Sequence, residues 1–352
     1  MTPGEYRRDI KDLFTLDDYK NDLGSVAHLL VHFAIIVVSL TSAALNVDAW
    51  PWYATLACGV IAGHSGMVAS FAGHEIGHGG GRMPLFIRRF LELLGWTFVL
   101  FATPTTQRKA HNVLHHGNAN SPIDPDRRLM LSETEPLGES VGILEWLIPN
   151  VRHPILTRIW GFSFMIFSYH NSLLVHSLFR TGEIYDIRLG EKPRVNAMME
   201  FTWNVGVYFA LWALSGFSGI MLATLVLTYF TLSTMAALYI TTNHLLSGLI
   251  EGGNDPLATT VSVKVPAWID FLHLNFSHHT EHHLYPTASY RALPVIKAAL
   301  CERFPETYRE LEWKEAIRYL MASPIVMKDA NTYSHLDGSG DQTVYFPTTA
   351  RA

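Results

Sequence analysis

Three short histidine clusters stand out in the 352-residue sequence, because their residue types and spacing suit metal binding. The densest lies in FSHHTEHHLYP, where His278, His279, His282 and His283 fall within six residues. A buried imidazole needs a hydrogen-bond partner or a metal ion at its ring nitrogens. Four clustered imidazoles are therefore hard to accommodate in an apolar core, and this cluster predicts a metal site.

Two further clusters upstream share this character. His74 and His78 in HEIGH are four residues apart, which places both imidazoles on one face of an α-helix. HNVLHH repeats that spacing and adds an adjacent histidine, and a lone histidine follows Asn243. The predicted metal ligands are His74, His78, His111, His115, His116, His244, His279, His282 and His283. Nine imidazoles are too many for one tetrahedral zinc ion but would suit two six-coordinate ions.

The other candidates receive a structural interpretation. His278 is predicted either to bind metal or to lie beside the ligands. His64 is expected inside a membrane span, as an interior residue or as part of a substrate channel. Asp124 and Asp126 flank Pro125 and are predicted to form turns. Interior structural roles are also predicted for His153, His170, His176, His273 and His335.

Composition indicates a membrane protein. Hydrophobic residues make up 49% of the chain and charged residues 16%, against about 25% charged in a typical soluble domain. The net charge of −5, with no basic stripe interleaved with aromatic residues, gives no case for nucleic-acid binding. Only Cys58 and Cys301 are present, so the sequence indicates neither a disulfide framework nor a thiolate metal site.

Four apolar runs are long enough to form membrane-spanning helices, and these helices would position the histidine clusters. They cover residues 24–47, 53–73, 199–215 and 219–242, with a proline-containing turn in the first pair and a glycine-containing turn in the second. This pattern predicts an all-α integral membrane protein with four transmembrane helices in two hairpins. A cytoplasmic helical cap is expected to carry the histidine clusters.

Cationic residues predict the orientation, because Lys and Arg accumulate on the cytoplasmic side of membrane proteins. Those on the side of the histidine clusters are Arg7, Arg8, Lys11, Arg82, Arg88, Arg89, Arg108, Lys109, Arg127 and Arg128. The two predicted outer turns carry neither Lys nor Arg. The metal site and both termini are therefore expected to face the cytoplasm, in a multi-pass protein.

The remaining segments complete the predicted organisation. Residues 1–23 are expected to form a cytoplasmic N-terminal segment, residues 24–290 the membrane domain, and residues 291–352 cytoplasmic helices with a disordered tail of about 25 residues. Residues 91–103 are apolar but too short to span, and residues 155–179 are predicted to lie along the membrane surface because they contain polar residues.

The ligand type restricts the metal without identifying it. Imidazole suits iron, copper, zinc and nickel, so composition alone leaves these open. An indirect argument favours iron. A membrane-embedded site without an obvious hydrolytic nucleophile fits activation of O2 against a lipid C–H bond.

HEIGH, HNVLHH and HHTEHHLYP, in this order between paired apolar spans, resemble the three histidine boxes of the membrane fatty acid desaturase family. The resemblance covers roughly residues 24–290 and implies a non-haem di-iron centre (Fe2+/Fe3+) with O2 as co-substrate. It also implies a fatty acyl lipid, acyl-CoA or acyl-carrier substrate within a membrane lipid environment. It makes His244 an additional ligand and Glu75 a hydrogen-bond acceptor for a ligand imidazole. Because no HPGG-like haem-binding motif occurs, electrons are expected from a separate donor of the ferredoxin or cytochrome-b type.

Three alternatives remain. The second box has three residues between its first and paired histidines, which is similar to alkane and xylene hydroxylases, so a di-iron lipid or alkyl hydroxylase or a ketolase is the runner-up. HEIGH also matches the HExxH signature of zinc proteases, with Glu75 as the base, but this leaves the other clusters unexplained. A histidine-rich transporter would place ionisable groups within its spans, where only His28, His32 and His64 occur.

Overall fold

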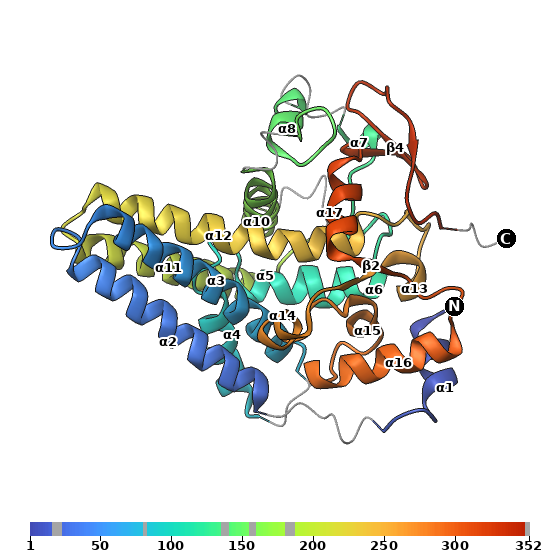
Figure 1. The fold of residues 1–352 in the computed structure, drawn as a ribbon, viewed down its shortest axis with the longest axis horizontal. Helices are drawn as coiled ribbons and strands as arrows, with labels where there is room; N and C mark the ends of the chain where they lie inside the picture. Colours follow the sequence, from blue (N-terminus) through green and yellow to red (C-terminus); the bar gives the residue numbers. More distant parts are fainter. Residues whose placement is uncertain (16–22, 80–82, 135–140, 155–159, 180–186, 349–352) are drawn as a thin grey trace.

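The computed structural model describes residues 1–15, 23–79, 83–134, 141–154, 160–179 and 187–348, and these residues are mostly helical. Three of the described helices are long and apolar enough to cross a membrane: α2 (Gly24–Leu45), α3 (Trp52–Gly77) and α12 (Gly219–His244). They correspond to three of the four predicted spans. They lie side by side with α3 in contact with both of the others (Figure 1).

Glycines on α3 let α12 approach closely. A Cβ atom on Gly59 would lie 2.7 Å from the carbonyl oxygen of Thr224, and one on Gly63 would lie 2.6 Å from that of Thr228. These separations are too short for any side chain, so the two helix backbones touch along this stripe. Both helices end on the same side of the body, where α3 and α12 carry histidines.

The fourth predicted span, residues 199–215, lies in α11 (Glu191–Leu214). This helix contacts α2 and α12, and a tight turn at residues 215–218 joins it to α12 as predicted. α11 is not among the candidate spans, because it is less apolar than α2, α3 and α12; its first half contains Lys192, Arg194 and Glu200. Its second half exposes large apolar side chains such as Phe209. The fourth span therefore stays a prediction.

Shorter helices cover the histidine-bearing ends of these long helices. α4 (Leu85–Trp96) packs on α3 at a glycine pair, where a Cβ atom on Gly95 would lie 2.7 Å from the Cα atom of Gly73. α10 (Phe162–Phe179) packs along α12 and forms part of the helical body, while its position relative to a membrane stays a prediction. Arg82 and the predicted surface residues 155–159 lie outside the described residues.

The remaining helices of the described segments are short. They are α1 (Pro3–Ile10), α5 (Pro104–Lys109), a π-helix (Ala110–His115), α6 (His116–Asn118), α7 (Leu131–Thr134), α8 (Val141–Leu147), α13 (Pro256–Thr259), α14 (Ala267–Leu272), α15 (His279–Leu284), a 3-10 turn (Tyr290–Ala292), α16 (Leu293–Arg303) and α17 (Trp313–Met321). A parallel pair, β1 (Ser262–Lys264) and β2 (Glu310–Glu312), joins the third histidine cluster to the C-terminal region.

The tail predicted to be disordered is folded up to residue 348. β3 (Val326–Asp329), β4 (Thr332–Ser334) and β5 (Gln342–Thr343) form an antiparallel sheet beside α17. The prediction was wrong because the apolar residues of this segment are sparse, but Tyr333 and Val344 among them are buried against the rest of the protein. Tyr333 is fully buried, and its ring lies under the guanidinium of Arg128, with 4.6 Å between the Arg128 Cζ atom and the ring centroid.

Candidate metal centre

All nine predicted ligands meet at the ends of α3 and α12. They form two adjacent groups, and within each group the candidate ligand atoms lie within 4.8 Å of one another. The five-histidine group contains His74, His78, His111, His116 and His282. The four-histidine group contains His115, His244, His279 and His283.

The first box lies where α3 ends. His74 is in the last turn and His78 is the residue that caps the helix C-terminus. Their Nε2 atoms are 3.1 Å apart, so the four-residue spacing places both imidazoles on one face as predicted. Asn112 holds the second box against this helix end, because its Nδ2 donates a hydrogen bond to the carbonyl oxygen of Gly77 at 3.2 Å.

The second box has a different geometry from the predicted α-helix. Residues 110–115 form a π-helix, which takes one more residue per turn than an α-helix. In an α-helix, His116 would point about 140° away from His111. In the π-helix the two Nε2 atoms are 3.0 Å apart and belong to the same group, whereas His115 joins the four-histidine group. The second box therefore serves both groups.

The four-histidine group is completed by two distant elements. His244 is the last residue of α12, and the third box forms the two-turn helix α15. The Nε2 atom of His244 lies 2.6 Å from that of His279 and 3.2 Å from that of His115. His283 approaches His115 with an Nε2–Nε2 distance of 3.1 Å. Each nitrogen thus faces the same small volume.

This donor arrangement fits bound metal ions. Two imidazole nitrogens bound in adjacent positions at about 2.1 Å from one ion would lie about 3 Å apart, close to the separations observed. Burial and neighbouring imidazoles hold the pKa of His78, His116, His279 and His283 well below its usual value, and burial lowers the pKa of His282 to about 3. The neutral form that these effects favour is the form that coordinates metal.

Asp124 and Asp126, predicted to be turn formers, also contact the ligands. Oδ1 of Asp124 lies 2.8 Å from Nδ1 of His115, while its carboxylate accepts hydrogen bonds from the backbone N–H groups of Asn120 and Asp126. Burial disfavours a charged His115, but Asp124 and Asp126 outweigh burial and raise the pKa of His115 to about 9. The same negative charge would stabilise a metal cation at the opposite ring nitrogen.

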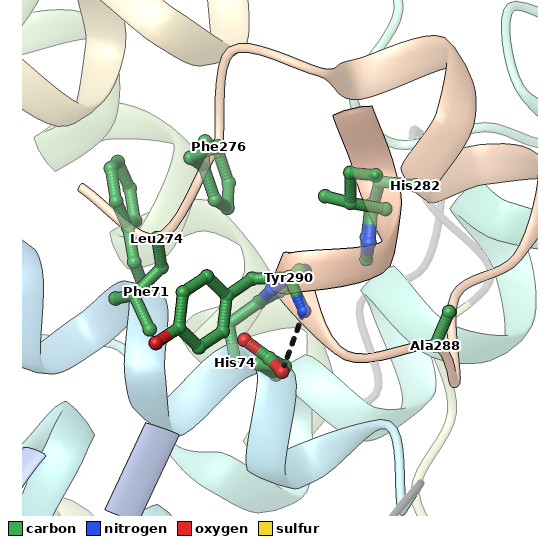
Figure 2. A pocket seen from close by; sticks show the side chains of 9 residues that line it. Phe71, His74, Leu274, Phe276, His282, Ala288 and Tyr290 are labelled. Carbon is green, nitrogen blue, oxygen red and sulfur yellow. Dashed lines mark hydrogen bonds between the residues drawn. The ribbon is translucent and has the colours of Figure 1, made fainter. Parts of the chain in front are cut away.

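Acidic residues within the other two boxes anchor the backbone around the site. Glu75 accepts a hydrogen bond from the backbone N–H of Tyr290 at 3.1 Å, and Figure 2 shows this bond beside a small pocket that includes His74 and His282. Glu281 is fully buried and accepts hydrogen bonds from the hydroxyls of Ser262 and Tyr308. These bonds tie α3 to the segment after α15, and α15 to the β1–β2 region.

A large apolar cavity of about 400 Å3 reaches both histidine groups. Its walls include side chains of α3, α4, α10, α12 and α17 and of the C-terminal segment. Two buried donors in its wall, Nη2 of Arg128 and Nε2 of Gln107, lack a hydrogen-bond partner among the described residues. Arg128 otherwise donates to the carbonyl oxygens of Leu245 and Pro324. The cavity is therefore apolar with a few polar donors.

His278 lies outside both histidine groups. Its Nε2 atom is 3.9 Å from a carboxylate oxygen of Asp270, and burial lowers its pKa to about 4. His64 and His273 also lie outside the groups, but their Nε2 atoms approach to 3.1 Å. Sequence reasoning missed the contacts of Asp124, Glu281 and Tyr308. For Asp124, the sequence signal was the Asp-Pro-Asp motif at residues 124–126, which places two carboxylates shortly after the second box.

The sequence was also compared with known protein families and with curated proteins. A family model described as fatty acid desaturase matches residues 50–314, which include all three histidine boxes and His244. No curated protein matches the chain in a sequence search.

Proposed function

The chain belongs to the fatty acid desaturase family, and we propose that it is a membrane oxidoreductase that introduces a double bond into a fatty acyl chain at a histidine-bound di-iron centre. The observation that carries this proposal is the convergence of nine imidazoles, in groups of five and four, at the wall of an apolar cavity. An all-imidazole donor set is compatible with redox-active iron, and the apolar cavity beside it suits an acyl chain.

The five-histidine and four-histidine groups would each hold one iron ion. When bound, the two ions would supply the redox chemistry that activates O2 for hydrogen removal from an unactivated methylene. Asp124 fixes the ring of His115 and keeps a proton on Nδ1, which leaves Nε2 free to bind. The bond from Tyr290 to Glu75 fixes the end of α3 that carries His74.

The cavity provides the space for an acyl chain. It is in contact with His74, His111, His115, His244 and His279, so a chain lying in it would pass both groups. Its apolar wall would exclude water and hold the methylenes in place, while the unpartnered donors of Arg128 and Gln107 would suit the oxygens at the polar end of the substrate. An acyl lipid, acyl-CoA and an acyl-carrier protein all present such oxygens.

Hydroxylation or ketolation of an alkyl chain is the alternative. These reactions begin with the same hydrogen removal, and the position of the next C–H bond then selects the outcome. The longer spacing in the second box favoured this alternative. The π-helix weakens that argument, since it places His111 and His116 on one face despite the additional residue.

The membrane arrangement is part of the proposal. We place α11 in the membrane beside α12 as a fourth span, with the exposed apolar side chains of its second half facing lipid. The histidine groups and the termini would face the cytoplasm, where cationic residues gather. Electrons would come from a separate ferredoxin or cytochrome-b-type protein.

Lipid analysis tests the reaction. A host expressing the chain should accumulate lipids that have lost two hydrogens, and the purified protein should contain two irons per chain. Incorporation of labelled oxygen from O2 into the major product would instead indicate hydroxylation. His116→Ala and His282→Ala should abolish the product while membrane insertion remains. Stoichiometric zinc with negligible iron would contradict the di-iron proposal.

A further inference from the structure

A tyrosine and two histidines form a hydrogen-bonded line outside the two metal groups. The hydroxyl of Tyr239, on α12, lies 2.8 Å from Nδ1 of His273. Nε2 of His273 lies 3.1 Å from Nε2 of His64, on α3. With the phenol donating to Nδ1, the Nε2–H of His273 donates to His64. Three elements far apart in sequence thus place a phenol next to a base that can pass on a proton.

An aromatic ring connects this line to the metal centre. The ring of Tyr239 packs against that of Phe276, with 6.0 Å between their centroids. Phe276 in turn lies 5.4 Å from the His74 ring, 5.8 Å from His279 and 6.5 Å from His282, all centroid to centroid. Figure 2 shows Phe276 with His74 and His282 around one pocket. Tyr239 is therefore separated from imidazoles of both groups by a single phenyl ring.

The ring of Phe276 determines whether electrons or protons can pass between Tyr239 and the candidate metal ligands. Phe276 has no exchangeable proton, so it cannot relay protons between Tyr239 and the ligands. An electron can cross one ring in van der Waals contact. The proton released when a phenol is oxidised must leave locally, and His273 is placed to accept it. The geometry thus suits oxidation of Tyr239 and does not suit proton delivery to the metal centre.

We propose that Tyr239 is a redox-active residue that reduces the oxidised iron centre when the acyl cavity is empty. The proposal rests on the di-iron function above. In this step the O–H bond of Tyr239 breaks, one electron reduces the iron centre by one equivalent, and the proton forms an N–H bond at Nδ1 of His273. The Nε2 proton of His273 passes to His64. The separate one-electron donor protein then reduces the tyrosyl radical, and the proton returns from His64 through His273 to re-form the O–H bond of Tyr239.

The position of Tyr239 fits this protective role. Phe71 and Phe276 line the acyl cavity, and both pack against Tyr239, with centroids 5.6 Å and 6.0 Å from its ring. Tyr239 lies behind them and does not contribute to the described cavity wall. A bound acyl chain would therefore not displace Tyr239. When no chain is present, this phenol is an oxidisable group close to the ligands.

Electron paramagnetic resonance tests the proposal. The iron-loaded protein in detergent, reduced without air, is exposed to O2 in the absence of acyl substrate and frozen at successive times. We expect an organic radical signal that narrows when the protein contains ring-deuterated tyrosine. Tyr239→Phe should lose this signal while keeping its iron and its desaturated product.

Two further variants separate a redox role from a structural one. Tyr229 lies on the same helix, about 15 Å away along the axis, and its ring packs on Phe167. Tyr229→Phe should keep the radical signal. His273→Asn keeps a hydrogen-bond acceptor but removes the base, so the radical yield should fall while the iron content does not change.

The outcomes distinguish this proposal from the proposed function. A protein that contains iron and forms the double bond, but shows no tyrosyl signal or retains it in Tyr239→Phe, would overturn only the role of Tyr239. A protein without iron or without an oxidised lipid product would contradict the di-iron function itself.

Discussion

His111 and His116 are five residues apart in the sequence, yet their Nε2 atoms are only 3.0 Å apart, because the backbone between them forms a π-helix. Positions i, i+4 and i+5 of a π-helix lie nearly where i, i+3 and i+4 lie in an α-helix. The second box can therefore place His111 and His116 in one group and His115 in the other.

This relationship predicts that shortening the second box by one residue affects iron binding less than lengthening it by one residue. Deleting the exposed Val113 should let residues 110–115 become α-helical and keep both groups assembled, because the three histidines would regain nearly the same directions. Inserting an alanine after Val113 should separate His111 from His116. Iron content of the two purified proteins measures the difference. Equal iron loss in both would contradict the geometric equivalence.

Asp124→Asn should weaken metal binding in the four-histidine group. The amide lacks the negative charge that stabilises a cation on His115, and loss of such a partner typically costs about 10- to 100-fold in metal affinity or activity. Iron titration with a competing chelator gives the affinity. Asp341→Asn, in an exposed ion pair with Lys328, is the matched control and should behave like wild type.

Gly63→Ala should destabilise the fold, since its Cβ atom would lie 2.6 Å from both the Thr228 carbonyl oxygen and the Thr231 Cβ atom. We expect a loss of about 1–3 kcal/mol in the free energy of unfolding, as for other overpacked sites. Gly206→Ala is the control, because the added methyl meets no atom within 4 Å and should stabilise α11 by about 0.5–1 kcal/mol. Unfolding in detergent, followed by circular dichroism, compares the two.

Ala236→Phe should narrow the range of acyl chains that are oxidised. Ala236 is buried on α12 and lines the cavity, so a phenyl ring there would occupy space needed by a long chain. Product analysis over a series of chain lengths should show a loss of the longest substrates with unchanged iron content. Leu222→Phe, at an exposed position on the same helix, should leave the series unchanged. A uniform loss of activity across chain lengths would argue against this assignment of the cavity.

Local patterns in the sequence were sufficient for part of this architecture. Apolar run lengths indicated α2, α3 and α12, and the four-residue spacing of His74 and His78 placed both on one helix face. Helices were also predicted in the segment after residue 290, where the structure has α16 and α17. These features depend on periodicity within one element, which the sequence records directly.

Features that depend on packing between distant segments could not be predicted. HNVLHH is compatible with an α-helix or a π-helix. In the structure it forms a π-helix, and its residues contact α3 and α15. The contact of Asp124 with His115 occurs in a loop where Asn120 adopts a left-handed backbone with a φ of 57°. The C-terminal strands have only two to four residues each, and burial of Tyr333 against distant residues marks them as ordered.

The folded C-terminal segment forms one wall of the acyl cavity, through residues such as Ile325, Val326 and Leu336, whereas every candidate metal ligand precedes residue 284. This segment therefore helps to shape the cavity without supplying any of the nine candidate ligands, whereas α3 and α12 contribute to both the cavity wall and the candidate metal centre. A truncation that removed residues 322–348 would therefore remove part of the cavity wall while leaving all nine candidate histidine ligands in the chain.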